Sequence, residues 1–191
     1  MEKIKVYEAK IDEEGELGVY AISFVDEPAI QSGFMHFKNQ YKLRKIDEDK
    51  RMVYGPAMIP DLPIYRVDEK GNEFFIKFPK DVVREMAHRF LMKNNHQNTT
   101  VDHEKKLSNT IVVESWLKEG DSDKSISLGL GELPDGTWLT GSKVNDDDVW
   151  MRVKSGELTG YSIEVDLDRV LVGADPVDEL VKEMEQIINS I

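Results

Sequence analysis

A histidine and a serine of this sequence have settings that are compatible with covalent hydrolysis, although neither stands out by residue type and spacing alone. The chain contains no cysteine, so a covalent mechanism would need serine, threonine, lysine or a carboxylate as nucleophile. A serine nucleophile needs a base to take its proton, and that base is usually histidine. Of the four histidines, His103 in VDHEKK ends a strand-like run between Asp102 and Glu104, carboxylates that can orient an imidazole ring. A surface histidine in a charged turn fits the same pattern, and both interpretations stay open.

The serine candidate is Ser162, in the run LTGYSIEVD. Gly160 and Tyr161 precede it and a strand-like run follows, a setting that can hold a serine at the rim of a sheet. An ordinary strand serine is equally compatible with this pattern. The G-x-S-x-G elbow of many hydrolases is absent.

Metal and nucleotide chemistry have little support in the sequence. No H-E-x-x-H motif occurs, and the histidines at 88, 96 and 103 do not have ligand spacing on one element. The acidic run 146–148 lacks the pattern of a calcium loop and is better explained as a helix start. No P-loop or G-x-G-x-x-G motif occurs. We therefore expect no metal and no cofactor.

Charge and hydropathy narrow the classes of partner. The net charge of −12 would repel nucleic-acid phosphates, so direct binding of DNA or RNA is not expected. No run approaches the roughly 18 apolar residues of a membrane span, and the N-terminus lacks the apolar region of a signal peptide. These features predict a cytoplasmic protein without membrane contact, and the lack of cysteine fits a reducing compartment.

The elements that must position His103 and Ser162 are mostly short strands. The pattern predicts strands at 3–9, 18–26, 33–38, 50–59, 63–67, 73–78, 98–104, 109–117 and 136–144, and a turn followed by a strand over 158–170. Helices are predicted at 79–93 and 146–157, and a loop at 120–136. His88 lies off the apolar face of the first helix and is expected to be exposed. The 68–72 run predicts a hairpin turn.

The chain is expected to form one domain over residues 1–175, followed by a C-terminal helix over 176–191. That last segment has apolar residues at helical spacing along one face. Such a face either packs on the domain or contacts a partner.

The order of several short motifs points to a known family. The runs VYAISFVDEPAI (19–30), VDHE (101–104), VVESWL (112–117) and LPDGTWLTGSKVNDDDVWMRVKSGELTGYSIE (133–164) occur in that order. In this the chain resembles the prohead (procapsid maturation) serine proteases of tailed phages and prophages. The resemblance implies an α+β fold, a mixed and mostly antiparallel β-barrel ringed by a few helices, like the herpesvirus maturation protease.

The resemblance also assigns roles to residues. The family's serine falls on Ser162, the nucleophile, and its histidine on His103, the general base and then general acid. Glu114 is the first choice for an acidic third member, because a neighbouring antiparallel strand could bring its carboxylate to the imidazole. Asp102, Glu104 and Asp166 remain alternatives.

The implied function is a serine endopeptidase that cleaves scaffold and major capsid protein precursors, and itself, during prohead maturation. The expected location is the host cytoplasm, inside the assembling prohead, with self-association of the protease. Few residues follow Ser162, so a truncated or self-cleaved form is one interpretation. The main alternative is an inactive structural or scaffold-associated virion protein on the same fold, and a more distant one is a small hydrolase unrelated to phages.

Overall fold

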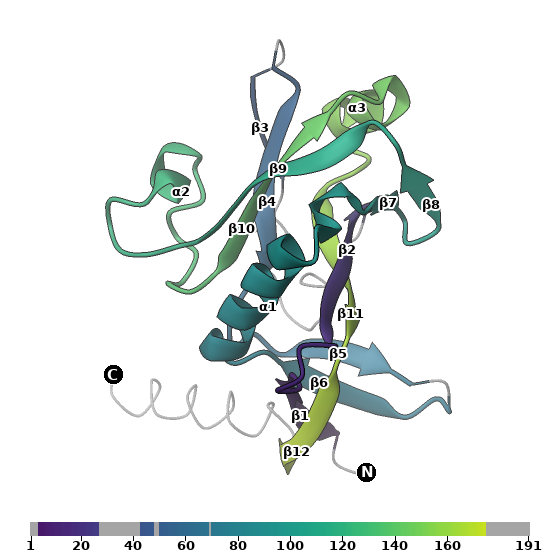
Figure 1. Ribbon diagram of the computed structural model, residues 1–191, viewed down its shortest axis with the longest axis vertical. Coiled ribbons are helices and arrows are strands. Elements are labelled where there is room, and N and C mark those ends of the chain that lie inside the picture. Colours follow the sequence, from purple (N-terminus) through teal and green to yellow (C-terminus); the bar gives the residue numbers. More distant parts are fainter. Residues whose placement is uncertain (1–3, 27–42, 48–49, 69, 175–191) are drawn as a thin grey trace, which may run out of the picture.

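A computed structural model describes residues 4–26, 43–47, 50–68 and 70–174, and its strands form three four-stranded sheets (Figure 1). The first, ordered β12-β1-β6-β5, contains β1 (Lys5–Lys10), β5 (Ile64–Val67), β6 (Glu73–Lys77) and β12 (Asp168–Ala174). The second, ordered β3-β4-β10-β9, contains β3 (Arg44–Asp47), β4 (Met52–Met58), β9 (Thr110–Leu117) and β10 (Trp138–Val144). The third, ordered β11-β2-β7-β8, contains β2 (Gly18–Val25), β7 (Thr99–Val101), β8 (Lys105–Leu107) and β11 (Gly160–Asp166).

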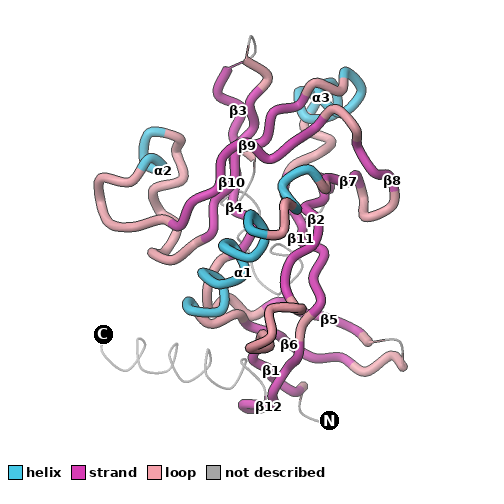
Figure 2. The backbone as a smooth tube through the Cα atoms, in the orientation of Figure 1, coloured by secondary structure: helices cyan, strands magenta, loops and turns pink. Residues whose placement is uncertain are grey.

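The described residues contain few helices beside the many strands (Figure 2). They are α1 (Lys80–Met92), α2 (Lys124–Ser127), α3 (Asp147–Ser155) and the 3-10 turn η2 (Asn95–Gln97). Helix α1 packs against β2, β9 and β10, between the second and third sheets. Its buried face includes Val83, Met86 and Phe90, whereas His88 points to solvent as predicted.

The expected closed barrel is not observed. The fold is mixed α+β and mostly strand, but its three sheets do not join into one continuous ring of paired strands. Closure requires hydrogen bonding from the first strand round to the last, and each sheet here ends in an edge strand within the described residues. Most pairings are antiparallel, as predicted, with parallel pairs between β1 and β6 and between β2 and β7. The likeness to the herpesvirus protease fold stays a prediction.

Most predicted elements are present with small boundary shifts. Both predicted helices within the described residues form, and α3 is capped by Asp146, whose carboxylate accepts hydrogen bonds from the amides of Asp148 and Val149. The hairpin between β5 and β6 also forms. Strands β3 and β8 and helix α2 were not predicted, and the turn and strand predicted over 158–170 contain all of β11 and the start of β12. The strand predicted at 33–38 and the helix predicted at 176–191 lie outside the described residues.

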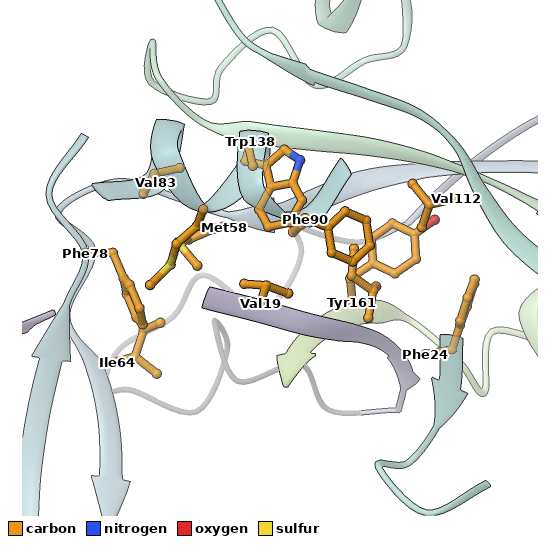
Figure 3. Packing of buried hydrophobic residues seen from close by; sticks show 14 of the residues in the cluster. Val19, Phe24, Met58, Ile64, Phe78, Val83, Phe90, Val112, Trp138 and Tyr161 are labelled. Atoms are coloured by element: carbon orange, nitrogen blue, oxygen red, sulfur yellow. The ribbon is translucent and has the colours of Figure 1, made fainter. Parts of the chain in front are cut away.

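A hydrophobic core links the sheets and α1 (Figure 3). Phe90 of α1 packs edge-on against Trp138 of β10, with ring centroids 5.3 Å apart, and both side chains are fully buried. Tyr161 of β11 packs in the same way on Phe24 of β2, at 5.1 Å. The Tyr161 hydroxyl donates to Ser142 Oγ at 2.8 Å, which joins the third sheet to the second. The strand that carries Ser162 is therefore held from behind by packed aromatic rings.

Candidate active site

His103 lies in the tight turn between β7 and β8. Asp102 and His103 have φ values of 52° and 60°, and the Glu104 amide donates to the Val101 carbonyl at 3.0 Å. Two successive left-handed residues closed by such a bond are the signature of a type I′ hairpin turn. Histidine seldom adopts the left-handed backbone region, because the Cβ atom is crowded there. It keeps this conformation only where neighbouring contacts hold it.

Neighbouring strands supply those contacts. The Asp102 amide donates to the Phe24 carbonyl at 3.0 Å, and the His103 amide donates to Ser23 Oγ at 2.9 Å. The Asp102 carboxylate accepts from Arg152 of α3 at 3.1 Å. The turn is thus fastened on one side to β2 and on the other to α3.

Ser162 lies on β11. In the third sheet, β2 separates β11 from β7. The register partner of Ser162 is Ser23 of β2, and the side chain of Ser162 is recessed, with 7% of the residue exposed. Side chains two residues apart on a strand share a face and are separated by roughly 6.6 Å. Glu164 therefore points from the same face of β11 as Ser162.

Glu164 is the carboxylate that meets the histidine. His103 Nδ1 lies 3.3 Å from Glu164 Oε1, and the same oxygen accepts a hydrogen bond from Thr100 Oγ1 at 2.6 Å. With Nδ1 donating to Glu164, the other ring nitrogen, Nε2, is the acceptor of a neutral imidazole. The structure thus brings His103 and Ser162 to one face of the third sheet, where Glu164 contacts the histidine. Among the hydrogen bonds of the described residues, none joins His103 directly to Ser162.

Glu114 belongs to a different network. It lies on β9 of the second sheet, where it accepts from the Tyr54 hydroxyl at 2.7 Å and pairs with Lys124. Burial alone would raise the pKa of Glu114, but the hydrogen bonds from Lys124 and Tyr54 lower it overall. Burial, together with the bond to Glu114, raises the pKa of Tyr54 to about 12. Within the described residues the imidazole contacts Glu164, and the expected contact with Glu114 is not formed.

The other acidic candidates are also placed. Asp102 pairs with Arg152 through its side chain, and Glu104 and Asp166 are exposed. Glu164 was not considered from the sequence, although GYSIE places it two positions after Ser162. Strand alternation was the signal that could have found it, because a carboxylate at that spacing must share the serine's face.

A cavity of about 590 Å³ borders β11. Its lining is mainly apolar and includes Tyr161, Ile163 and Val165, which share one face of β11, together with Ser162. Glu164 and His103 do not line it. Within the described part of the chain, no cluster of histidine and carboxylate side chains has the arrangement of a metal site.

The family is shown by comparison with known proteins. The model of a family described as "Putative phage serine protease XkdF" matches residues 40–170, so the chain belongs to this family of phage serine proteases. The chain is 27% identical over 152 residues to the phage-like element PBSX protein XkdF of Bacillus subtilis (strain 168), covering 74% of this chain and 50% of that protein.

A second relative, the uncharacterized protein YqbD of the same organism, is 25% identical over 178 residues, covering 88% of this chain and 50% of that protein. The chain thus spans about half the length of these curated relatives. No solved structure matches it. In the described residues, no helix has the length and apolar character needed to cross a bilayer.

Proposed function

We propose that this chain is a serine endopeptidase in which Ser162 is the nucleophile, His103 the general base and Glu164 the carboxylate that orients the histidine. The observation that carries this assignment is the contact of His103 Nδ1 with Glu164, which projects from the same face of β11 as Ser162. Membership of a phage serine protease family supports it. Glu164 replaces Glu114 as the proposed third member.

The proposed reaction follows from this arrangement. Ser162 Oγ attacks the scissile carbonyl carbon while its proton passes to His103 Nε2. The tetrahedral intermediate then breaks its C–N bond, and the amine leaves with the proton from His103. Water attacks the resulting acyl ester, again giving a proton to His103. The ester C–O bond breaks, the acid product leaves and Ser162 regains its proton.

Glu164 stabilises the imidazolium that forms in both steps. Its side chain is 16% exposed, whereas that of His103 is 43% exposed. The histidine therefore faces solvent at the open side of the site, and the carboxylate and serine lie deeper. We propose that substrate enters from the His103 side of the third sheet.

The proposed substrates are the scaffold and major capsid protein precursors of a phage prohead, and the chain itself. The proposed setting is the assembling prohead in the host cytoplasm, with the protease self-associated. The support is membership of a phage protease family and the relation to a phage-like element protein. Direct contact with DNA is not part of the proposal, because the net charge is −12.

An inactive structural role on the same fold is the second candidate. The lack of a direct hydrogen bond between His103 and Ser162 in the described residues favours it, as does the recessed serine. Catalytic hydrogen bonds are often long in proteins without bound substrate and tighten in the complex. The two functions are therefore separated by measuring turnover.

The test compares wild type with Ser162→Ala and His103→Ala, each co-expressed with the scaffold and capsid proteins of the same phage. Ser127→Ala, at an exposed serine of α2, is the matched control. Intact mass follows the precursors, and reaction with a fluorophosphonate, which Ser Oγ attacks with loss of fluoride, follows Ser162. We expect trimming and labelling in wild type and the control only. Identical precursor masses in all four, with no labelling, would establish the structural role instead.

A further inference from the structure

Ser23 connects the histidine turn to the nucleophile strand. It is fully buried near the C-terminal end of β2, and its Oγ accepts the hydrogen bond from the His103 amide at 2.9 Å. This bond is made by a side chain, whereas the neighbouring Asp102 amide bonds to a carbonyl. The amide of the left-handed histidine therefore depends on one hydroxyl for its partner.

The register of the third sheet places Ser23 at the centre of the site. It pairs with Ser162 of β11 on one side and with Thr100 of β7 on the other. Directly opposed residues of antiparallel strands have Cβ atoms roughly 4.5–5.5 Å apart. Thr100 in turn donates to Glu164. Ser23 thus lies beside the strand that carries Ser162 and the turn that carries His103. It also lies beside Thr100, which donates to Glu164.

We infer that Ser23 is a positioning residue of this site, whose hydroxyl holds the His103 turn against the strand that carries Ser162. The inference rests on the proposed function. Ser23 lies before the residues 40–170 that match the family model, so family membership does not imply this role. Without an acceptor at position 23, the His103 amide loses its partner inside the fold and the left-handed turn loses one of its attachments. The imidazole then moves relative to Glu164 and Ser162.

A matched pair of substitutions separates this role from packing. Ser23→Thr and Ser23→Val give side chains of the same shape, of which only threonine keeps the hydroxyl. Ser115→Ala is the control, because Ser115 Oγ also accepts one N–H bond, from Trp138 Nε1 at 2.9 Å, but lies in the second sheet. Thermal unfolding of all variants shows which of them remain folded.

Two readouts are measured on the whole chain. The first is kcat and KM for precursor cleavage, with the rate of fluorophosphonate labelling at Ser162. The second is hydrogen exchange of the His103 amide by NMR. A misplacement of about 1 Å costs on the order of 100-fold in rate, so Ser23→Val should lower kcat and the labelling rate by about 10- to 100-fold, with KM little changed. Its His103 amide should exchange faster, while Ser23→Thr and Ser115→Ala resemble wild type.

The inference is overturned if Ser23→Val is labelled as fast as Ser23→Thr, or if the His103 amide is equally protected in both. A threonine variant as slow as the valine variant would assign the effect to packing and overturn it too. A wild type that neither cleaves nor is labelled would refute the proposed function instead. Exchange at the His103 amide would then still decide whether Ser23 holds the turn.

Discussion

Replacing Glu164 by glutamine tests the site more sharply than removing the nucleophile. The new side chain keeps the size of the old one and a carbonyl oxygen that can accept from Thr100. Because a single oxygen, Oε1, contacts both Thr100 Oγ1 and His103 Nδ1, this carbonyl oxygen can also accept from Nδ1 and keep the proton there. The substitution therefore removes the negative charge beside His103 while leaving its hydrogen bonds and the packing nearly unchanged.

The expected size of the effect follows from the contact. A hydrogen bond to a charged group contributes about 1.5–3 kcal/mol, and about 1.4 kcal/mol corresponds to a factor of ten. The His103 to Glu164 contact is 3.3 Å long, and the histidine side chain is 43% exposed. Both features weaken it, so we expect kcat to fall by roughly 10- to 100-fold, less than the loss seen when the carboxylate of a buried triad is neutralised.

The matched control is Glu114→Gln. Glu114 is also a partly buried strand glutamate with two side-chain partners, Tyr54 and Lys124, but it lies in the second sheet. We expect it to alter stability and to leave kcat near the wild-type value. The assay is the rate of fluorophosphonate labelling at Ser162, with precursor cleavage measured alongside and thermal unfolding used to confirm folding.

The opposite pattern would refute the reasoning. If Glu114→Gln lost activity while folded and Glu164→Gln retained it, the acidic member would be the one first predicted from the sequence. Wild-type activity in both variants would show that the imidazole works without either carboxylate. In that case the contact with Glu164 would be a surface ion pair of little consequence.

Three further predictions concern the framework around the site. The raised pKa of Tyr54, about 12 against an ordinary 10.0, means that its stabilising contribution is complete below pH 10 and is lost as pH rises toward 12. Denaturant unfolding should therefore show a loss between pH 10 and 12 that is smaller in Tyr54→Phe, and equal losses would contradict this. Asp146→Ala removes the N-cap of α3 and should cost about 1 kcal/mol, or roughly 2–4 °C in Tm by calorimetry, whereas Asp148→Ala, without a capping bond, should cost less. Phe90→Ala should cost about 3–5 kcal/mol in chemical unfolding, and Leu91→Ala, at a position 43% exposed on the same helix, only about 0.5 kcal/mol; similar losses would show that the burial does not govern stability.

Local patterns in the sequence predicted local structure well. Apolar spacing at 3.6 residues located α1, and the acidic residues of a first turn located α3. Sheet membership was not predictable in the same way. Strand β2 pairs with β7 and with β11, and both of these strands lie far from β2 along the chain. Periodicity carries no information about such partners, so the barrel was expected from the resemblance alone. The prediction that the barrel is closed was wrong.

The proposed pair of residues could be named from motifs, whereas the contacts between strands could not be predicted. His103 and Ser162 were assigned through the resemblance, by the order of motifs, and in the structure they lie at one face of the third sheet. Glu114 was chosen because an adjacent strand could reach the histidine, but β9 pairs with β10 in another sheet. Because β11 pairs with β2 and β2 pairs with β7, Glu164 lies beside His103 instead.

Strand β2 lies between the strand that carries Ser162 and the strand that leads into the His103 turn. Side chains cross β2 to Glu164 both from β7 itself, through Thr100, and from the turn, through His103. A left-handed turn at the end of β7 lets the chain fold back while its imidazole reaches across β2 to Glu164. The strain at Asp102 and His103 is then balanced by bonds to Phe24, Ser23 and Arg152. Catalytic geometry would thus depend on β2, a strand that carries none of the three proposed reactive groups.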